Sequence, residues 1–170
     1  RSWFDDPLGD HEVDAPQAWS TTTGDTGVVI AIIDTGILPY HPDLGGSTAG
    51  LFGNVWRNWA EVAGVAGADD DGNGYVDDLW GWDFVSNGGG NVTPGEEGLD
   101  ADNDPNDFVG HGTKVASIAG ALTDNVIGAA GTAWNTRLMA LRIGWAEPGA
   151  TYGAVDMSYA AEGIRYATRN

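Results

Sequence analysis

Residues 28–36 read VVIAIIDTG, and this stretch decides the fold. A run that is apolar on both faces is typical of a central strand in a parallel sheet, with helices covering both sides. Asp34 then lies at the carboxyl end of that strand, where open α/β sheets place their sites. An ionised carboxylate buried there needs a partner, because burying an isolated charge is costly. Alternatively, Asp34 caps the turn formed with Thr35 and Gly36.

The rest of the chain supplies the other elements of a doubly wound α/β fold, with a mainly parallel sheet and helices on both faces. Residues 111–122 and 157–167 place apolar side chains at helical spacing, and residues 15–19 could form a helical turn. Residues 137–143, RLMALRI, indicate a second strand. The last helix has no strand after it, so we expect the sheet to be incomplete in this chain.

The chain has 170 residues, which suits one domain or a piece of a larger one. We expect residues 1–170 to form the N-terminal part of a single domain, with residues 1–14 as a polar arm. Residues 45–110 are rich in Gly, Asp and Asn and show little periodicity. A loop region of that length is usually functional or held by ions.

Composition excludes several classes of function. The chain has 25 Asp and Glu against 7 Lys and Arg, a formal net charge of -18, which argues against binding nucleic acid or an anionic membrane surface. No apolar run is long enough to span a bilayer. The absence of Cys excludes disulfides, thiolate zinc sites and a Cys nucleophile.

Residues 110–114, GHGTK, place His111 at the start of the first long helix, between two glycines. By itself such a His is more often a cap or a surface residue. With Asp34 at a neighbouring strand end, however, the carboxylate could orient the imidazole while His111 takes a proton from a serine hydroxyl. The sequence thus predicts two parts of a nucleophile-activating triad.

These segments resemble motifs of the subtilisin-like serine proteases. Residues 29–37 and the HPDL at 41–44 resemble their aspartate motif, HGT at 111–113 followed by Val115 and Ala116 resembles their histidine motif, and residues 125–131 resemble the following loop. The order, Asp before His, agrees with a family in which Ser comes last. The resemblance covers about the first half of such a catalytic domain. It implies a secreted, extracellular, calcium-stabilised endopeptidase acting on peptides or proteins.

Two departures from the family pattern matter. Lys114 stands where the family usually has a second His, and the serine motif is absent, since Ala133 rather than Ser follows Thr132. The resemblance therefore implies that the nucleophile lies outside this chain, on a C-terminal fragment that partners it. We expect the isolated chain to be inactive.

Residues 69–78, DDDGNGYVDD, resemble the first half of an EF-hand loop, with acids at alternate positions and Gly at the sixth. The predicted ligands of Ca²⁺ are Asp69, Asp71, Asn73 and the carbonyl of Tyr75, with Asp78 or Asp77 closing the shell. The twelfth position is Trp80 rather than Glu, so a true EF-hand is not expected. The alternative is an acidic, solvated turn.

The family resemblance implies a second calcium site around Asp43, which otherwise caps a turn. Its predicted ligands are Asp43, Asp6, Asn125 and the carbonyls of Thr123, Ile127 and Ala129. We interpret the acidic segment 100–107 as a solvated face.

Three rival functions follow from the same residues. The DTG at 34–36 also occurs in aspartic proteases, but Ile37 and the helical segments disagree with that all-β family. A metalloprotease is disfavoured because the three His have no ligand spacing. A non-catalytic, calcium-binding module of protease-like fold that binds a protein partner remains the main alternative.

Overall fold

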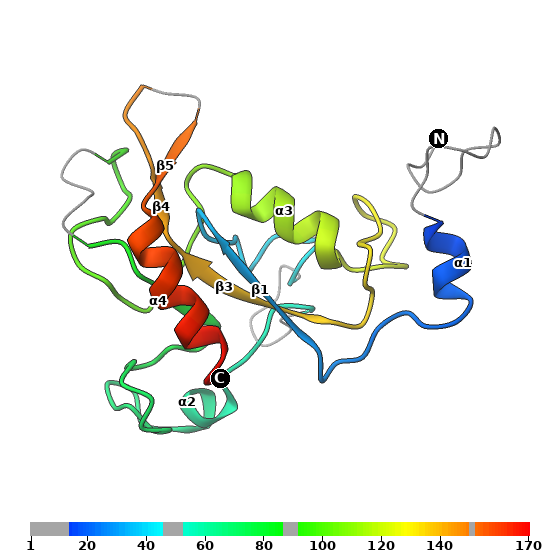
Figure 1. Ribbon diagram of the computed structural model, residues 1–170, viewed down its shortest axis with the longest axis horizontal. Helices are drawn as coiled ribbons and strands as arrows, with labels where there is room; N and C mark the ends of the chain where they lie inside the picture. Colours follow the sequence, from blue (N-terminus) through cyan, green and yellow to red (C-terminus); the bar gives the residue numbers. More distant parts are fainter. Residues whose placement is uncertain (1–13, 46–52, 87–91, 150–151) are drawn as a thin grey trace.

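The computed structural model describes residues 14–45, 53–86, 92–149 and 152–170 (Figure 1). Within them the helices are α1 (Ala15–Trp19), α2 (Trp59–Ala63), α3 (His111–Gly120) and α4 (Met157–Ala167). The strands are β1 (Val29–Asp34), β2 (Gly81–Asp83), β3 (Arg137–Arg142), β4 (Gly144–Ala146) and β5 (Gly153–Val155). The two long predicted helices and both predicted strands are therefore confirmed.

The main sheet is parallel, with strand order β1-β3-β2. β3 pairs with β1 from Val29↔Arg137 to Asp34↔Arg142, and on its other side Asp83 of β2 lies opposite Arg142. This register places Asp34, Arg142 and Asp83 in one row at the carboxyl end of the sheet. The row is the platform on which the candidate site is built.

Helices cover both faces of this sheet, as predicted (Figure 1). Alternate residues of β1 point to opposite faces. Ile32 packs in a cluster with Ala116 of α3, whereas Ile33 packs against a second cluster that includes Ala160 of α4. Each helix packs on its own face of the sheet mainly through small residues such as Ala116 and Ala160. The larger members of the predicted apolar stripes are exposed instead, namely Val115, Ile118, Met157 and Ile164.

The position of β1 differs from the prediction of a central strand. In the part of the chain that the structure describes, β1 pairs with β3 on one side only, and Val28 and Val29 are 51% and 39% exposed. A run of six apolar residues predicts burial on both faces of a strand. It does not predict whether both edges are paired.

Short elements within and after the predicted loop region were not predicted. Helix α2 and strand β2 both lie inside residues 45–110. Asn58 caps α2, since its side chain accepts a hydrogen bond from the N–H of Ala60 at 3.2 Å. β4 and β5 form an antiparallel hairpin between β3 and α4. Elements of three to five residues carry too few positions for a periodic pattern to be recognised. None of the helices described is long and apolar enough to cross a membrane.

Candidate functional site

Asp34 and His111 are in contact. The Nδ1 atom of His111 lies 2.8 Å from Oδ1 and 2.9 Å from Oδ2 of Asp34. Asp34 is the last residue of β1 and His111 the first of α3, so the parallel sheet and its covering helix bring them together. The His111 side chain is 66% exposed and that of Asp34 is 16% exposed. With Nδ1 turned to the carboxylate, Nε2 is the ring nitrogen left to act on another group.

A glycine permits this close approach. A Cβ atom at position 112 would lie 2.1 Å from the carbonyl oxygen of Gly36 and 3.2 Å from Oδ1 of Asp34. Any side chain at Gly112 would therefore push the start of α3 away from the turn that follows β1. The glycine after His111 is thus a requirement of packing between two backbones.

A hollow of about 530 Å³ lies beside the pair. It is bounded by the carboxyl end of the sheet, the first turns of α3 and α4, and the β4–β5 hairpin. Besides Asp34 and His111, its lining includes Ile33, Val109, Lys114, Tyr152, Val155 and Met157. Lys114 therefore brings a positive charge to the same hollow, at the position where the family pattern has a second His.

Behind the pair, Arg142 forms a buried ionic group that the sequence did not reveal. Its guanidinium pairs with Asp83 and, at 2.6 Å, with Oε1 of Glu96, and its Nε donates to the carbonyl of Gly144 at 3.1 Å. Burial raises the pKa of Asp83 to about 8, although Arg142 acts in the opposite direction. Desolvation of the carboxylate is the largest cause, and the charge of Asp102 acts in the same direction.

Segment 100–107 is not uniformly a solvated face. Asp100 and Asp104 are exposed, as predicted, but Asp107 is 5% exposed, so for this residue the prediction was wrong. Its carboxylate accepts hydrogen bonds from both threonines next to the Asp34–His111 pair, Thr35 and Thr113. A run of acidic residues does not show which of them will be buried, so the composition of the segment could not predict the burial of Asp107.

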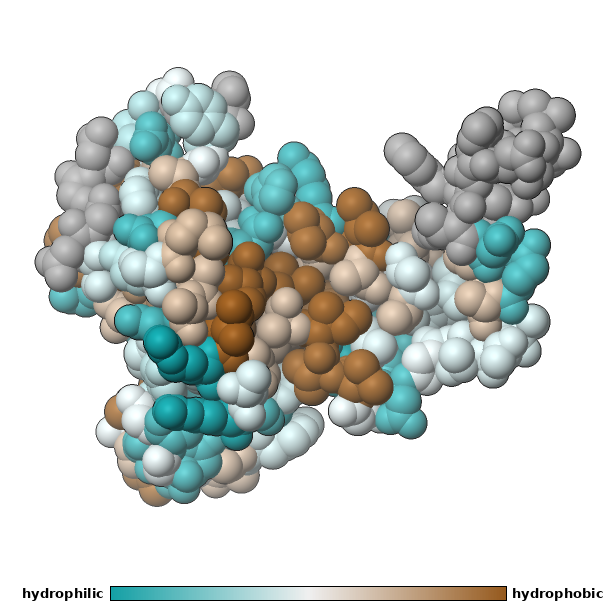
Figure 2. Space-filling model, in the orientation of Figure 1, coloured by the Kyte–Doolittle hydropathy of each residue, from teal (hydrophilic) through white to brown (hydrophobic). Residues whose placement is uncertain are grey.

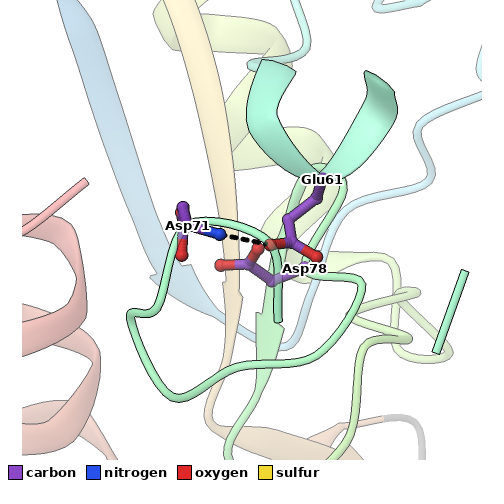
Figure 3. Close-up of side chains that lie close together, drawn as sticks. All are labelled: Glu61, Asp71 and Asp78. Atoms are coloured by element: carbon purple, nitrogen blue, oxygen red, sulfur yellow. Dashed lines mark hydrogen bonds between the residues drawn. The ribbon is translucent and has the colours of Figure 1, made fainter. Parts of the chain in front are cut away.

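The acidic loop, residues 69–78, brings two of its predicted ligands together. Carboxylate oxygens of Asp71, Asp78 and Glu61 lie within 4.8 Å of one another (Figure 3). Glu61 comes from α2, outside the EF-hand pattern, so the spacing of the loop could not indicate it. Glu61 also holds the loop by accepting hydrogen bonds from the backbone N–H groups of Asp70, Asp71 and Asp77.

The other predicted ligands of this loop have different partners. Both oxygens of Asp69 accept backbone N–H groups, from Asn73 at 3.1 Å and Gly74 at 2.9 Å. The side-chain oxygen of Asn73 accepts from the N–H of Tyr75 at 2.7 Å, and the ring of Tyr75 packs against Trp82. The structure thus groups Asp71 and Asp78 with Glu61, and leaves Asp69 outside this group of described residues.

The donor set of Glu61, Asp71 and Asp78 fits a hard cation. All three offer carboxylate oxygens, the ligands that Ca²⁺ prefers, and among the described residues none of them pairs with a lysine or an arginine. Burial raises the pKa of Asp78, three side-chain hydrogen bonds, the one from Tyr166 first, act against it, and the charge of Asp71 adds to the rise. A divalent cation would relieve this repulsion.

The predicted second loop wraps around Asp43, which is 5% exposed. Its Oδ1 accepts from the side-chain amide of Asn125 at 3.1 Å, and its Oδ2 accepts from the N–H of Ala129 at 3.1 Å. Val126, between them, has φ 63°, which is costly for a β-branched residue. Two of the predicted ligands, Asn125 and Ala129, therefore contact Asp43, and both do so through N–H groups. Thr123 and Ile127 have their hydrogen bonds within the loop, to Ala121 and Asn125. Asp6 lies outside the described residues.

Comparison with known proteins identifies the family. The model of the subtilase family matches residues 25–167. The chain is 33% identical over 159 residues to thermitase of Thermoactinomyces vulgaris, covering 94% of this chain and 39% of that protein. It is 34% identical over 127 residues to subtilisin-like protease 1 of Plasmodium berghei (strain Anka), which covers 75% of this chain and 18% of that protein.

A thermophilic serine proteinase of Bacillus sp. (strain AK1) is 35% identical over 125 residues, which covers 74% of this chain and 20% of that protein. The chain therefore spans two-fifths or less of the length of these relatives. The match of the family model, which covers most of the chain, agrees with the Asp34–His111 contact and with the parallel sheet that supports it. This chain belongs to the subtilase family.

Proposed function

We propose that residues 1–170 form the N-terminal part of the catalytic domain of a serine endopeptidase. Asp34 orients His111, and His111 removes the proton from a serine hydroxyl that comes from outside this chain. The observation that carries the proposal is the contact of His111 Nδ1 with Asp34, at 2.8 Å, beside an open hollow. The subtilase relatives support the same class of reaction.

The geometry supports a specific division of labour. The carboxylate of Asp34 accepts a hydrogen bond from the Nδ1–H group of His111. This bond fixes the tautomer that leaves Nε2 unprotonated and able to act as a general base. Asp34 also stabilises the imidazolium that forms once the serine proton has moved. The same proton then goes to the leaving amine, and the acyl-enzyme is hydrolysed by water. The substrate is a peptide or a protein.

An exposed apolar face supports the proposal that a further segment completes the domain. Hydrophobic residues gather around β1, between α3 and α4 (Figure 2). The exposed members on these three elements and just before β1 are Val28, Val29, Val115, Ile118, Met157 and Ile164. Because β1 pairs on one edge only among the described residues, a further parallel strand would cover both the edge and the patch. We propose that this segment carries the serine.

We further propose that the chain binds Ca²⁺ in the acidic loop, through Glu61, Asp71 and Asp78, with Asp69, Asn73 and Tyr75 as the ligands that the loop pattern adds. A second ion would lie beside Asp43. The ion would supply the positive charge that the clustered carboxylates lack. We propose that the enzyme is secreted and extracellular, which the likeness to the subtilase relatives supports; the absence of Cys indicates no compartment.

The function is tested with the complete protein that contains this chain and a fluorogenic peptide. We expect hydrolysis, covalent labelling by a serine-reactive phosphonate, and loss of nearly all activity in His111→Ala. The 170-residue chain alone should be inactive and should regain activity when mixed with the complementary segment. Inhibition by a hydroxyl-bearing peptide mimic, without phosphonate labelling, would instead support the aspartic-protease reading. Activity of the isolated chain would contradict the proposed split of the triad.

One observation favours a second candidate, a non-catalytic calcium-binding module that binds a protein partner. Among the described residues, no serine hydroxyl hydrogen-bonds to His111. Intact mass of the native material separates the two candidates. A second polypeptide that copurifies and takes the phosphonate supports the protease, whereas a stable, monomeric chain that binds calcium and takes no phosphonate supports the module.

A further inference from the structure

Asp107 is a buried carboxylate between the two segments that carry Asp34 and His111. It is 5% exposed and accepts five hydrogen bonds. Its Oδ1 accepts from the Thr35 hydroxyl at 2.9 Å and from the N–H groups of Val109 at 3.0 Å and Gly110 at 2.7 Å; its Oδ2 accepts from the N–H of Thr113 at 2.9 Å and the Thr113 hydroxyl at 2.6 Å. Its two oxygens are thus occupied by donors from both segments.

The two threonines connect the segments in both directions. The hydroxyl of Thr35, directly after Asp34, donates to Asp107 and accepts the N–H of Gly112 at 3.0 Å. The hydroxyl of Thr113 also donates to Asp107 and accepts the N–H of Leu38 at 3.1 Å. Each hydroxyl has one proton, so its donation to the carboxylate leaves the oxygen free to accept from the opposite segment. Asp107 therefore sets the direction of all these bonds.

The surroundings of Asp107 suit a permanent negative charge. Helix α3 has Gly110 at its N-cap, which has no side chain to satisfy the first N–H groups, and Asp107 supplies that cap from three residues earlier. The helix N-terminus favours a carboxylate at this point. In the described part of the chain Asp107 forms no ion pair with a lysine or an arginine, so donors rather than a countercharge stabilise it.

We propose that Asp107 is a positioning residue that fixes Asp34 and His111 relative to one another by holding Thr35 and Thr113. The expected effect of Asp107 on catalysis rests on the proposed protease function. Its expected effect on the Asp34–His111 contact does not. A carboxylate is required, because an amide of the same shape has one oxygen and one NH₂ group. In Asp107→Asn the NH₂ group must face the donors of one threonine, so one of the two connections is lost.

The structural statement is tested by NMR on the complete protein that contains this chain, through the imidazole proton on Nδ1 of His111. In the unmodified protein this proton is hydrogen-bonded to Asp34 and should exchange slowly with water. We expect fast exchange and loss of the signal in Asp107→Asn and in Thr35→Val, which keeps the shape of Thr35 but removes the hydroxyl. Thr35→Ser, which keeps the hydroxyl, should retain the signal. Thr136→Val is the matched control, since it removes another buried threonine hydroxyl far from Asp107.

Backbone amide spectra show whether each variant is folded. If Asp107→Asn fails to fold, Thr35→Val decides, because it removes two hydrogen bonds only. A folded Thr35→Val with an unchanged Nδ1 signal overturns the proposal. So does equal loss of the signal in Thr136→Val, because the effect would then not be specific to the segments around Asp107.

The catalytic consequence is tested with the complete protein. Because misplacing reacting groups by about 1 Å can cost about 100-fold in rate, we expect Asp107→Asn to lower kcat by about 10- to 100-fold with KM little changed. In an Asp34→Asn background the same change should cost much less, because the pair that Asp107 positions is already broken. Equal losses in both backgrounds overturn the positioning role. If the unmodified complete protein is inactive, the proposed function fails while the NMR result still decides the role of Asp107.

Discussion

The acidic loop at residues 69–78 and the segment at 100–107 have similar compositions but satisfy their carboxylates in different ways. In the loop, Asp71 and Asp78 converge with Glu61 to within 4.8 Å. In the segment, Asp107 belongs to no such group of acids among the described residues, and it accepts five hydrogen bonds from N–H and O–H donors. The groups around a carboxylate, rather than the number of acids in its segment, thus decide whether it is suited to bind a cation or to accept structural hydrogen bonds.

The largest effect should come from removing calcium, which affects only the carboxylates of the first kind. A ligand present at 1,000 times its Kd stabilises a fold by about 4 kcal/mol, so we expect a chelator to lower the free energy of unfolding by about that amount. Thermal unfolding with calcium and with chelator measures it. Asp71→Asn should respond less to the chelator. Identical unfolding curves of the unmodified protein in both conditions would show that no ion contributes.

Asp107→Ala should lower the free energy of unfolding by nearly as much as calcium removal does, but calcium should not influence this loss. The change leaves buried donors of Thr35 and Thr113 without their acceptor, and we expect a loss of about 3 kcal/mol of unfolding free energy. Urea titration measures this loss in calcium and in chelator. If the two regions differ as described, the loss should be the same with calcium and with chelator. A loss that depends on calcium would contradict that difference.

A smaller effect should follow from Tyr166→Phe, which removes the hydroxyl that donates to Asp78. Burial raises the pKa of Tyr166, so this hydroxyl stays protonated and remains a donor. We expect a loss of about 1 kcal/mol, larger in chelator because Asp78 then depends on its donors alone. Tyr159→Phe, which removes a hydroxyl bonded to the carbonyl of Ser86, is the matched control. Its cost should be equal in calcium and chelator.

The last effect is a pH dependence and concerns Asp83, whose carboxylate is held in a third way, by the side chain of Arg142. Its pKa is raised to about 8 in the folded protein, so the native state holds a proton that the unfolded chain releases above about pH 4. Stability from this group is present at low pH and is lost as the pH rises from about 4 to about 8, by about 1 kcal/mol per pH unit at most. Unfolding free energies at several pH values should show a shallower fall in Asp83→Asn. If the unfolding free energy of Asp83→Asn fell as steeply with pH, the pH dependence would come from another group.

The sequence predicted the sheet and its covering helices because long apolar runs have a clear period. The VVIAII run and the stripe of α3 needed no tertiary information, and they placed Asp34 and His111 at facing ends. Glu61 and Asp107 could not be predicted in the same way. Their roles depend on contacts with residues such as Asp78 and Thr35, which are distant in the chain, and those contacts exist only once the fold has formed.

Helix α4 connects the acidic loop with the hollow beside His111. Near its C-terminal end, Tyr166 contacts Asp78, and Asn170 just beyond it accepts from Asn73 at 3.0 Å, whereas Met157 at its first turn lines the hollow beside His111. An α-helix of 11 residues is a stiff rod about 16 Å long. If the acidic loop binds calcium as proposed, removing the ion should first tilt this rod, and the wall of the hollow at Met157 should change before the Asp34–His111 contact breaks.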